Sequence, residues 1–154
     1  MPIRIRWFQG KHLGVAFILF GIAGLFQTLF IFHGQYLSGV GSTPVVTLIP
    51  IIATICIGYS AAILFEARSQ RSRDNQFRKG YKNKGGKLLQ SDLIFPVVLP
   101  LTIFGVIYLI AFAIAISAGT PMVSFLIAEN SAAIGVLIVA NLLGIRIAPN
   151  VKRY

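Results

Sequence analysis

The sequence contains little charge and very little acid. Only 12% of its 154 residues are charged, and four Asp or Glu stand against 14 Lys or Arg. Soluble domains are about 25% charged and about 45–50% apolar, whereas 56% of this chain is hydrophobic. The composition therefore excludes a soluble enzyme. The abundance of Ile, Leu, Val and Phe also excludes a disordered chain.

Cysteine and histidine are scarce as well. Cys56 is the single cysteine, so the chain cannot form an internal disulfide or a thiolate cluster. His12 and His33 are 21 residues apart, about 31 Å along a helix, and cannot together ligate one haem or one metal ion. No catalytic triad, phosphate-binding glycine loop or cysteine-rich metal motif can be assembled. We therefore expect no catalytic residue, no metal site and no cofactor, and we expect that the chain alone is not an enzyme.

Three long runs without charge dominate the sequence, over residues 12–65, 93–128 and 130–145. About 20 apolar residues cross the hydrocarbon core of a bilayer as a helix, and these runs have room for four such helices. The sequence predicts an all-α integral membrane four-helix bundle, a single transmembrane domain over residues 1–154. We expect helices at about 13–32, 45–65, 95–117 and 122–144, a turn at the Gly- and Pro-rich stretch 33–43, and a hydrophilic loop at 66–92.

The basic residues are distributed unevenly between these segments. Three precede the first predicted helix, eight lie in the 66–92 loop and three follow the last predicted helix, while the other two connections have none. The positive-inside rule then predicts that both termini and the basic loop are cytoplasmic. We expect a prokaryotic plasma membrane, and the 22 isoleucines indicate an AT-rich or thermophilic source.

The basic loop has two possible kinds of partner. The net charge of +10, with Phe77 and Tyr81 among basic residues, would suit stacking against nucleic acid. Anionic lipid headgroups attract such a segment by about 1 kcal/mol per basic residue near the surface. We favour anionic lipids and expect no nucleic acid, with Arg78, Lys79 and Lys82 as the candidate headgroup contacts.

Small residues mark the faces on which helices are expected to pack, because they let backbones approach closely in a membrane. Gly14 and Gly21 are seven residues apart and share a face of the first predicted helix. The fourth predicted helix has small residues at spacings of four, three and four, namely Ser124, Ala128, Ser131 and Gly135. We expect this stripe to face another helix.

Glu129 is the only acidic residue inside a predicted span. It lies about seven residues into the fourth helix, roughly 10 Å below the outer surface. A carboxyl at this depth is costly to bury when ionised, and such groups often belong to ion pathways. Gln27 lies at a similar depth in the first helix and is the predicted hydrogen-bond partner. Asn130 and Asn141 are eleven residues apart and therefore lie on nearly the same side of the fourth helix. These four residues are candidates either for an ion pathway or for polar contacts between helices.

The segment from Glu129 to Ile138 (ENSAAIGVLI) resembles the last helix of the rotary ATPase proteolipid family. Members of that family have about this length, four helices and an essential mid-membrane carboxylate in the fourth. The resemblance, carried by Glu129, Ala132 and Gly135, implies that Glu129 carries a proton or a sodium ion. It covers about ten residues. The first and third predicted helices lack the family's dense glycine repeats, the charge-derived topology is the reverse of the family's, and a 27-residue basic loop has no counterpart in a close-packed ring.

Three functions are compatible with these features. We favour a non-catalytic accessory or structural subunit of a multi-subunit membrane complex, such as a respiratory oxidase or a membrane oxygenase, with other membrane subunits as partners. The alternative is a small oligomeric proton or cation channel or carrier that uses Glu129. A lipid-binding protein that uses the basic loop is a third hypothesis.

Overall fold

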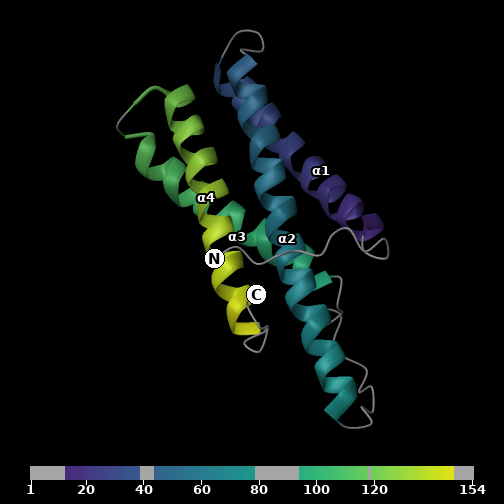
Figure 1. Cartoon of the computed structure of the whole chain (residues 1–154). Coiled ribbons are helices and arrows are strands. Elements are labelled where there is room, and N and C mark those ends of the chain that lie inside the picture. Colours follow the sequence, from purple (N-terminus) through teal and green to yellow (C-terminus); the bar gives the residue numbers. More distant parts are fainter. Residues whose placement is uncertain (1–12, 39–43, 79–93, 118, 148–154) are drawn as a thin grey trace.

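The computed structural model describes residues 13–38, 44–78, 94–117 and 119–147, and all of these segments are helical apart from a few residues at their ends. Four helices follow one another along the chain (Figure 1): α1 (Leu13–Ser38), α2 (Pro44–Arg78), α3 (Ile94–Ala115) and α4 (Pro121–Ile147). Each is long and apolar enough to cross a membrane. Over the described residues the structure therefore confirms the predicted class, an all-helical protein with four helices long and apolar enough to span a membrane.

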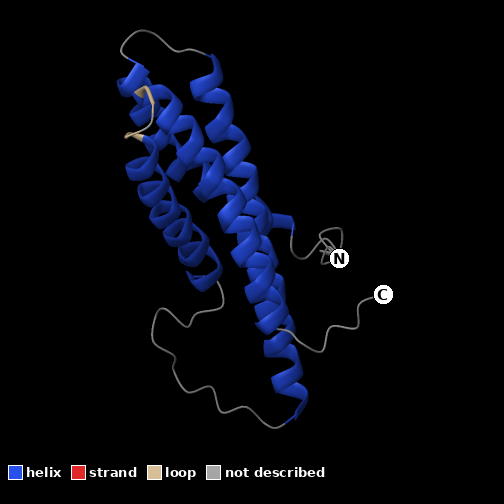
Figure 2. Ribbon diagram, turned by 90° about the vertical axis from the view of Figure 1, so that its left-hand side faces the viewer, coloured by secondary structure: helices blue, strands red, loops and turns tan. Residues whose placement is uncertain are grey.

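The four helices run alternately up and down, as Figures 1 and 2 show from two sides. The end of α1 and the start of α2 lie at the same end of the bundle as the end of α3 and the start of α4, and we call this the hairpin end. α4 packs most extensively against α2 and α3, while α1 packs mainly against α2. α2 projects beyond its neighbours at the opposite end of the bundle.

Small side chains fill the centre of the bundle, where α4 lies against its neighbours. Four alanines, Ala53 in α2 and Ala128, Ala132 and Ala133 in α4, belong to the same buried cluster as Val46, Ile57 and Val136. Their size permits the close backbone approach by which helices associate in lipid. Large aromatic rings, described below with the candidate site, lie towards the hairpin end.

Two helices extend further than the sequence analysis predicted. α1 continues to Ser38, whereas the sequence predicts that it ends near residue 32. The first residues of the predicted turn are helical instead, because they pack against other helices. The His33 ring lies 5.5 Å from the Phe112 ring, centroid to centroid. Gly34 lies so close to Phe125 and Val46 that any larger side chain would touch both. Gly34 therefore permits close packing within a helix and does not mark a turn.

α2 continues to Arg78, so the predicted loop at 66–92 begins with about thirteen helical residues. Gln70 Nε2 donates a hydrogen bond to Glu66 Oε1 at 3.2 Å, one helical turn back. The Arg68 guanidinium lies 4.8 Å from the centroid of the Phe95 ring of α3, a cation–π contact that ties the extension to its neighbour. Helix formation here is favoured because Glu, Ala, Arg and Gln have high helix propensity.

The predicted small-residue stripe of α4 is only partly correct. Ser124 and Ala128 are buried, and Gly135 packs against the Ile107 side chain, but Ser131 is exposed and Ala132 takes the buried place beside it. Gly14 and Gly21 of α1 are also exposed. Ser131, Gly14 and Gly21 therefore do not mark contacts between the described helices of this chain.

Gly34 and Gly21 offer a matched test of the packing of α1. A Cβ at Gly34 would lie 2.7 Å from Phe125 Cζ and 2.7 Å from Val46 Cγ1, both in fully buried side chains, while a Cβ at Gly21 would meet nothing within 4 Å. We expect Gly34→Ala to lower the free energy of unfolding by about 1–3 kcal/mol through overpacking. Gly21→Ala should be neutral or stabilising by up to about 1 kcal/mol, because Ala is the better helix former. Unfolding in mixed micelles, followed by circular dichroism, measures both; equal shifts would contradict the packing.

Candidate functional site: a polar cluster inside the bundle

Glu129 of α4 lies in the interior of the bundle. Its side chain is fully buried, on the same face as Phe125, Ala128 and Ala132. Neither carboxyl oxygen has a hydrogen-bond partner. A buried polar group without a partner is rare and costs about 1–3 kcal/mol, so each instance in a native structure is a candidate for a functional role.

Gln27 of α1 faces Glu129 across the bundle and is 1% exposed. Its amide lies close enough to interact with the Glu129 carboxyl. The contact nevertheless lacks the geometry of a well-formed hydrogen bond, and both amide atoms remain without a partner. The two groups are chemically matched, because an amide can donate to a carboxylate or accept from a protonated carboxyl.

Tyr108 of α3 completes the cluster, and the sequence analysis did not identify it. Its side chain is 4% exposed, and its hydroxyl is a third buried group without a hydrogen-bond partner. The hydroxyl is close enough to Glu129 to be affected by its charge. A tyrosine inside an uncharged run was the available signal, because a buried phenol usually requires a polar partner. Gln27, Tyr108 and Glu129 thus come from three different helices.

A cluster of aromatic rings packs around Tyr108, with contributions from α1, α3 and α4. The Tyr108 ring lies 4.6 Å from Phe30 and 6.3 Å from Phe125, centroid to centroid, in edge-to-face geometry. The His33 ring lies 6.2 Å from the Tyr108 ring. The remaining rings in contact are Phe26, Phe104 and Phe112. Aromatic pairs of this kind stabilise by about 0.5–1.5 kcal/mol each beyond their burial, so the cluster fixes Tyr108 in place.

Asn130 and Asn141 are not part of this cluster. Asn130 is exposed on the surface of α4, where its Nδ2 donates to the Leu126 carbonyl oxygen at 2.9 Å. Asn141 is half-buried and its Nδ2 donates to the Leu137 carbonyl oxygen at 2.9 Å. Both side chains therefore bond their own helix, and only Gln27 of the predicted candidates lies with Glu129.

The candidate headgroup contacts cannot be placed in this way. Arg78 is the last residue of α2, and its side chain lies outside the described part of the structure. Lys79 and Lys82 also lie outside the described residues. No three His, Cys, Asp or Glu side chains come together to form a metal site within the described segments.

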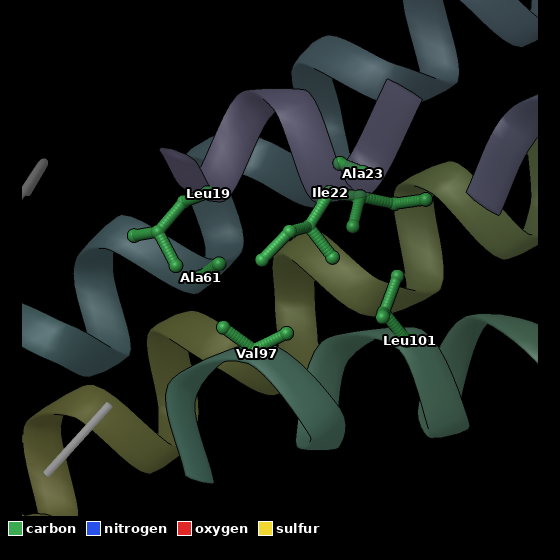
Figure 3. Close-up of a pocket in the computed structure, with 7 residues that line it drawn as sticks. Leu19, Ile22, Ala23, Ala61, Val97 and Leu101 are labelled. Carbon is green, nitrogen blue, oxygen red and sulfur yellow. The ribbon is translucent and has the colours of Figure 1, made fainter. Parts of the chain in front are cut away.

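A small apolar crevice lies between α1, α2 and α3 (Figure 3). Ile57 and the six labelled residues line it, namely Leu19, Ile22, Ala23, Ala61, Val97 and Leu101. Its walls are hydrocarbon side chains, so it offers hydrogen bonds to no ligand. Such a crevice can accept only methyl or methylene groups, such as those of a lipid chain, by dispersion contacts.

The chemistry available in the polar cluster is limited and clear. A carboxyl, an amide and a phenol can hold one proton between them, or they can hold helices together through hydrogen bonds in a medium without water.

Comparisons of the chain with protein-family models, curated proteins and solved structures find no match.

A double-mutant cycle tests the contact between Gln27 and Glu129. We expect Gln27→Leu and Glu129→Leu each to lower the free energy of unfolding by about 1–3 kcal/mol, because each leaves the other group buried among apolar side chains. The double variant should recover most of this loss, since replacing both partners with apolar groups can be nearly neutral. Chemical unfolding in micelles gives the coupling energy.

Gln27→Leu combined with Asn130→Leu serves as the control cycle, because Asn130 lies on the exposed face of α4. That pair should be additive within about 0.5 kcal/mol. Additive effects in both cycles would show that Gln27 and Glu129 do not interact.

Proposed function

We propose that this chain is a non-catalytic accessory or structural subunit of a multi-subunit membrane complex, such as a respiratory oxidase or a membrane oxygenase. The observation that supports this proposal is the pair Asn130 and Ser131, which lies on the exposed face of α4. Asn130 is nine residues from Pro121, the first residue of α4, about 14 Å along the helix. This depth lies within the hydrocarbon core of a bilayer if α4 spans it.

Other exposed hydroxyls near the middle of the helices are bonded to their own backbone. Thr28 donates to the Leu25 carbonyl oxygen at 2.6 Å and Thr102 to the Val98 carbonyl oxygen at 2.8 Å. By contrast, within the described part of the chain, neither Ser131 Oγ nor Asn130 Oδ1 has a hydrogen bond. Polar groups that face lipid without a partner are unfavourable, and a neighbouring protein helix can supply the missing bonds. This supports a protein neighbour on the outer face of α4.

The surroundings of this subunit follow from the charge pattern. We propose that it resides in a prokaryotic plasma membrane, with both termini and the basic 66–92 segment in the cytoplasm. The hairpin end then faces the opposite side. Anionic lipids are the proposed contacts of the basic segment, through Arg78, Lys79 and Lys82, by the electrostatic attraction that such segments have for negative headgroups.

A second function has specific support from the interior. Glu129 is fully buried and, together with Gln27 and Tyr108, forms a polar cluster among apolar and aromatic side chains. An ionisable group enclosed at this depth is the feature expected of a small oligomeric proton or cation carrier. In this alternative Glu129 takes up and releases the ion, while Gln27 and Tyr108 orient its carboxyl.

Co-purification distinguishes the two functions. We expect that mild detergent extraction of native membranes, followed by native electrophoresis and mass spectrometry, will find this chain with other membrane proteins in fixed ratio. The physical reason is that a subunit buries its exposed faces against those partners. If the chain migrates alone or only with copies of itself, the subunit proposal is wrong.

The variant Glu129→Gln separates the two roles of the buried carboxyl. The amide of Gln has nearly the same shape as the carboxyl of Glu but cannot release a proton near neutral pH. If the protein is a subunit, purified protein in vesicles should conduct no protons with either residue, and Glu129→Gln should change only stability or assembly. Fluorescent pH indicators inside the vesicles measure the flux. Proton flux that disappears in a folded Glu129→Gln variant would instead establish the carrier. Asn141→Gln, an exchange of one amide for another on the same helix, is the control that should leave flux unchanged.

A further inference from the structure

The exposed face of α4 has the spacing of a helix–helix contact. Six residues along it recur at alternating intervals of four and three, and we call them the α4 seam: Ile127, Ser131, Ile134, Ile138, Asn141 and Ile145. Asn141 is half-buried and the other five are exposed. An average spacing of 3.5 residues keeps a contact line on one side of two helices that wrap around each other with left-handed twist. Four of the six are isoleucines, whose stiff side chains pack well along such a line.

A donor within the seam, Ser131, lies beside an acceptor at its edge, Asn130. The Ser131 hydroxyl can donate a hydrogen bond, and the Asn130 side-chain oxygen, one residue earlier, can accept one. The Asn130 amide nitrogen is already engaged with the Leu126 carbonyl oxygen, which holds its oxygen in place. The Ser131 hydroxyl therefore lacks an acceptor, which an Asn130 side-chain oxygen can supply. The Asn130 oxygen lacks a donor, which a Ser131 hydroxyl can supply.

We infer that a second copy of this chain packs against this face, α4 against α4 in parallel, with Ser131 of each copy donating a hydrogen bond to Asn130 of the other. This inference rests on the proposal that α4 has a protein neighbour, and it specifies that neighbour as a second copy, so that the other subunits of the proposed complex contact the remaining exposed faces of the pair. A two-fold axis along the membrane normal places equal residues at equal depth and makes every contact twice. In parallel knobs-into-holes packing, a seam residue that follows an interval of four, as Ser131 follows Ile127, inserts beside the residue that precedes its equivalent in the partner helix. Ser131 of one copy thus meets Asn130 of the other.

The exposed faces of α1 and α3 lack this complementarity. Their central hydroxyls, Thr28 and Thr102, already donate to their own backbone. The small residues Gly14 and Gly21 leave room on α1, but they bring no polar group that requires a partner. Of these three exposed faces, that of α4 is therefore the one that a second copy would complete.

Disulfide cross-linking in native membranes tests the inference on the full chain. Cys56→Ala removes the only cysteine, and single cysteines are then placed at Ile134 in the seam, at Leu25 on α1 and at Leu109 on α3. These positions are 59%, 73% and 67% exposed, so the two controls are at least as accessible as the seam. Under mild oxidation Ile134→Cys should give a disulfide-linked dimer of the chain, about tenfold more than either control, a difference that corresponds to about 1.4 kcal/mol of association.

The hydrogen bonds are tested in the same Ile134→Cys background. Two symmetric bonds are lost in Asn130→Leu, which should reduce the dimer yield at limiting density roughly tenfold. Ser131→Ala removes the two donors and should act in the same direction. Thr28→Val, which removes an exposed hydroxyl on α1, should have no effect. If Asn130→Leu and Ser131→Ala leave the yield unchanged, the proposed bonds do not exist.

The remaining outcomes separate this inference from the proposed function. If Ile134→Cys links to a different protein and not to itself, the second copy is wrong while the subunit function stands. If Ile134→Cys links no more than the controls and forms no adduct with any protein, the inference is wrong. The protein neighbour of α4 that supports the subunit proposal is then absent as well.

Discussion

A polar group inside a bilayer can find hydrogen bonds only within protein, and this constraint determines how α4 is turned. Glu129 is the group that is most costly to expose to lipid, and it lies in the interior, facing Gln27. Because successive helical residues are about 100° apart, this placement fixes the rest of the helix. Phe125, Ala132 and Val136 are carried into the core, and Asn130 and Ser131 are carried outward. The interior site and the exposed polar pair are thus two consequences of one rotation.

The position of the spans along the chain could be predicted from sequence, because charge is excluded from hydrocarbon regardless of how the helices pack. The proximity of Gln27 to Glu129 followed from the similar position of the two residues along their helices. The ends of α1 and α2 could not be predicted. His33 and Gly34 have the composition of a turn, yet they are helical because Phe112, Phe125 and Val46 surround them. Residues 66–78 are too polar for a span but form good helix, so the end of the apolar run was not the end of α2.

Which residues face inward was much harder to predict, and the reason is physical. In a soluble helix the apolar stripe marks the core, whereas in a membrane the lipid is as apolar as the core. Residue size is then the main remaining signal, and it placed Ser131 at a helix contact although the neighbouring Ala132 takes that place. Tyr108 was missed for the same reason, since a single tyrosine among many apolar residues does not show which way it points. Only the contacts with Phe30, His33 and Phe125 reveal that it closes the site around Glu129.

The two polar features of α4 face different sides of the helix, since Asn130 and Ser131 are turned by about 100° and 200° away from Glu129, and this makes their roles separable. A contact through the seam would leave Glu129 enclosed in its own bundle, so a pair of chains would contain two independent carboxyl sites and not one shared site. A change at Asn130 then perturbs association without altering the surroundings of Gln27, Tyr108 or Glu129. A change at Glu129 perturbs the interior without removing any atom of the seam. A carrier that uses Glu129 would instead require its carboxyl to become accessible to an ion at some stage, and a fully buried Glu129 becomes accessible only if α4 turns or the bundle opens. The aromatic cluster opposes that movement, because Phe125 of α4 is packed against Tyr108 and His33 from two other helices.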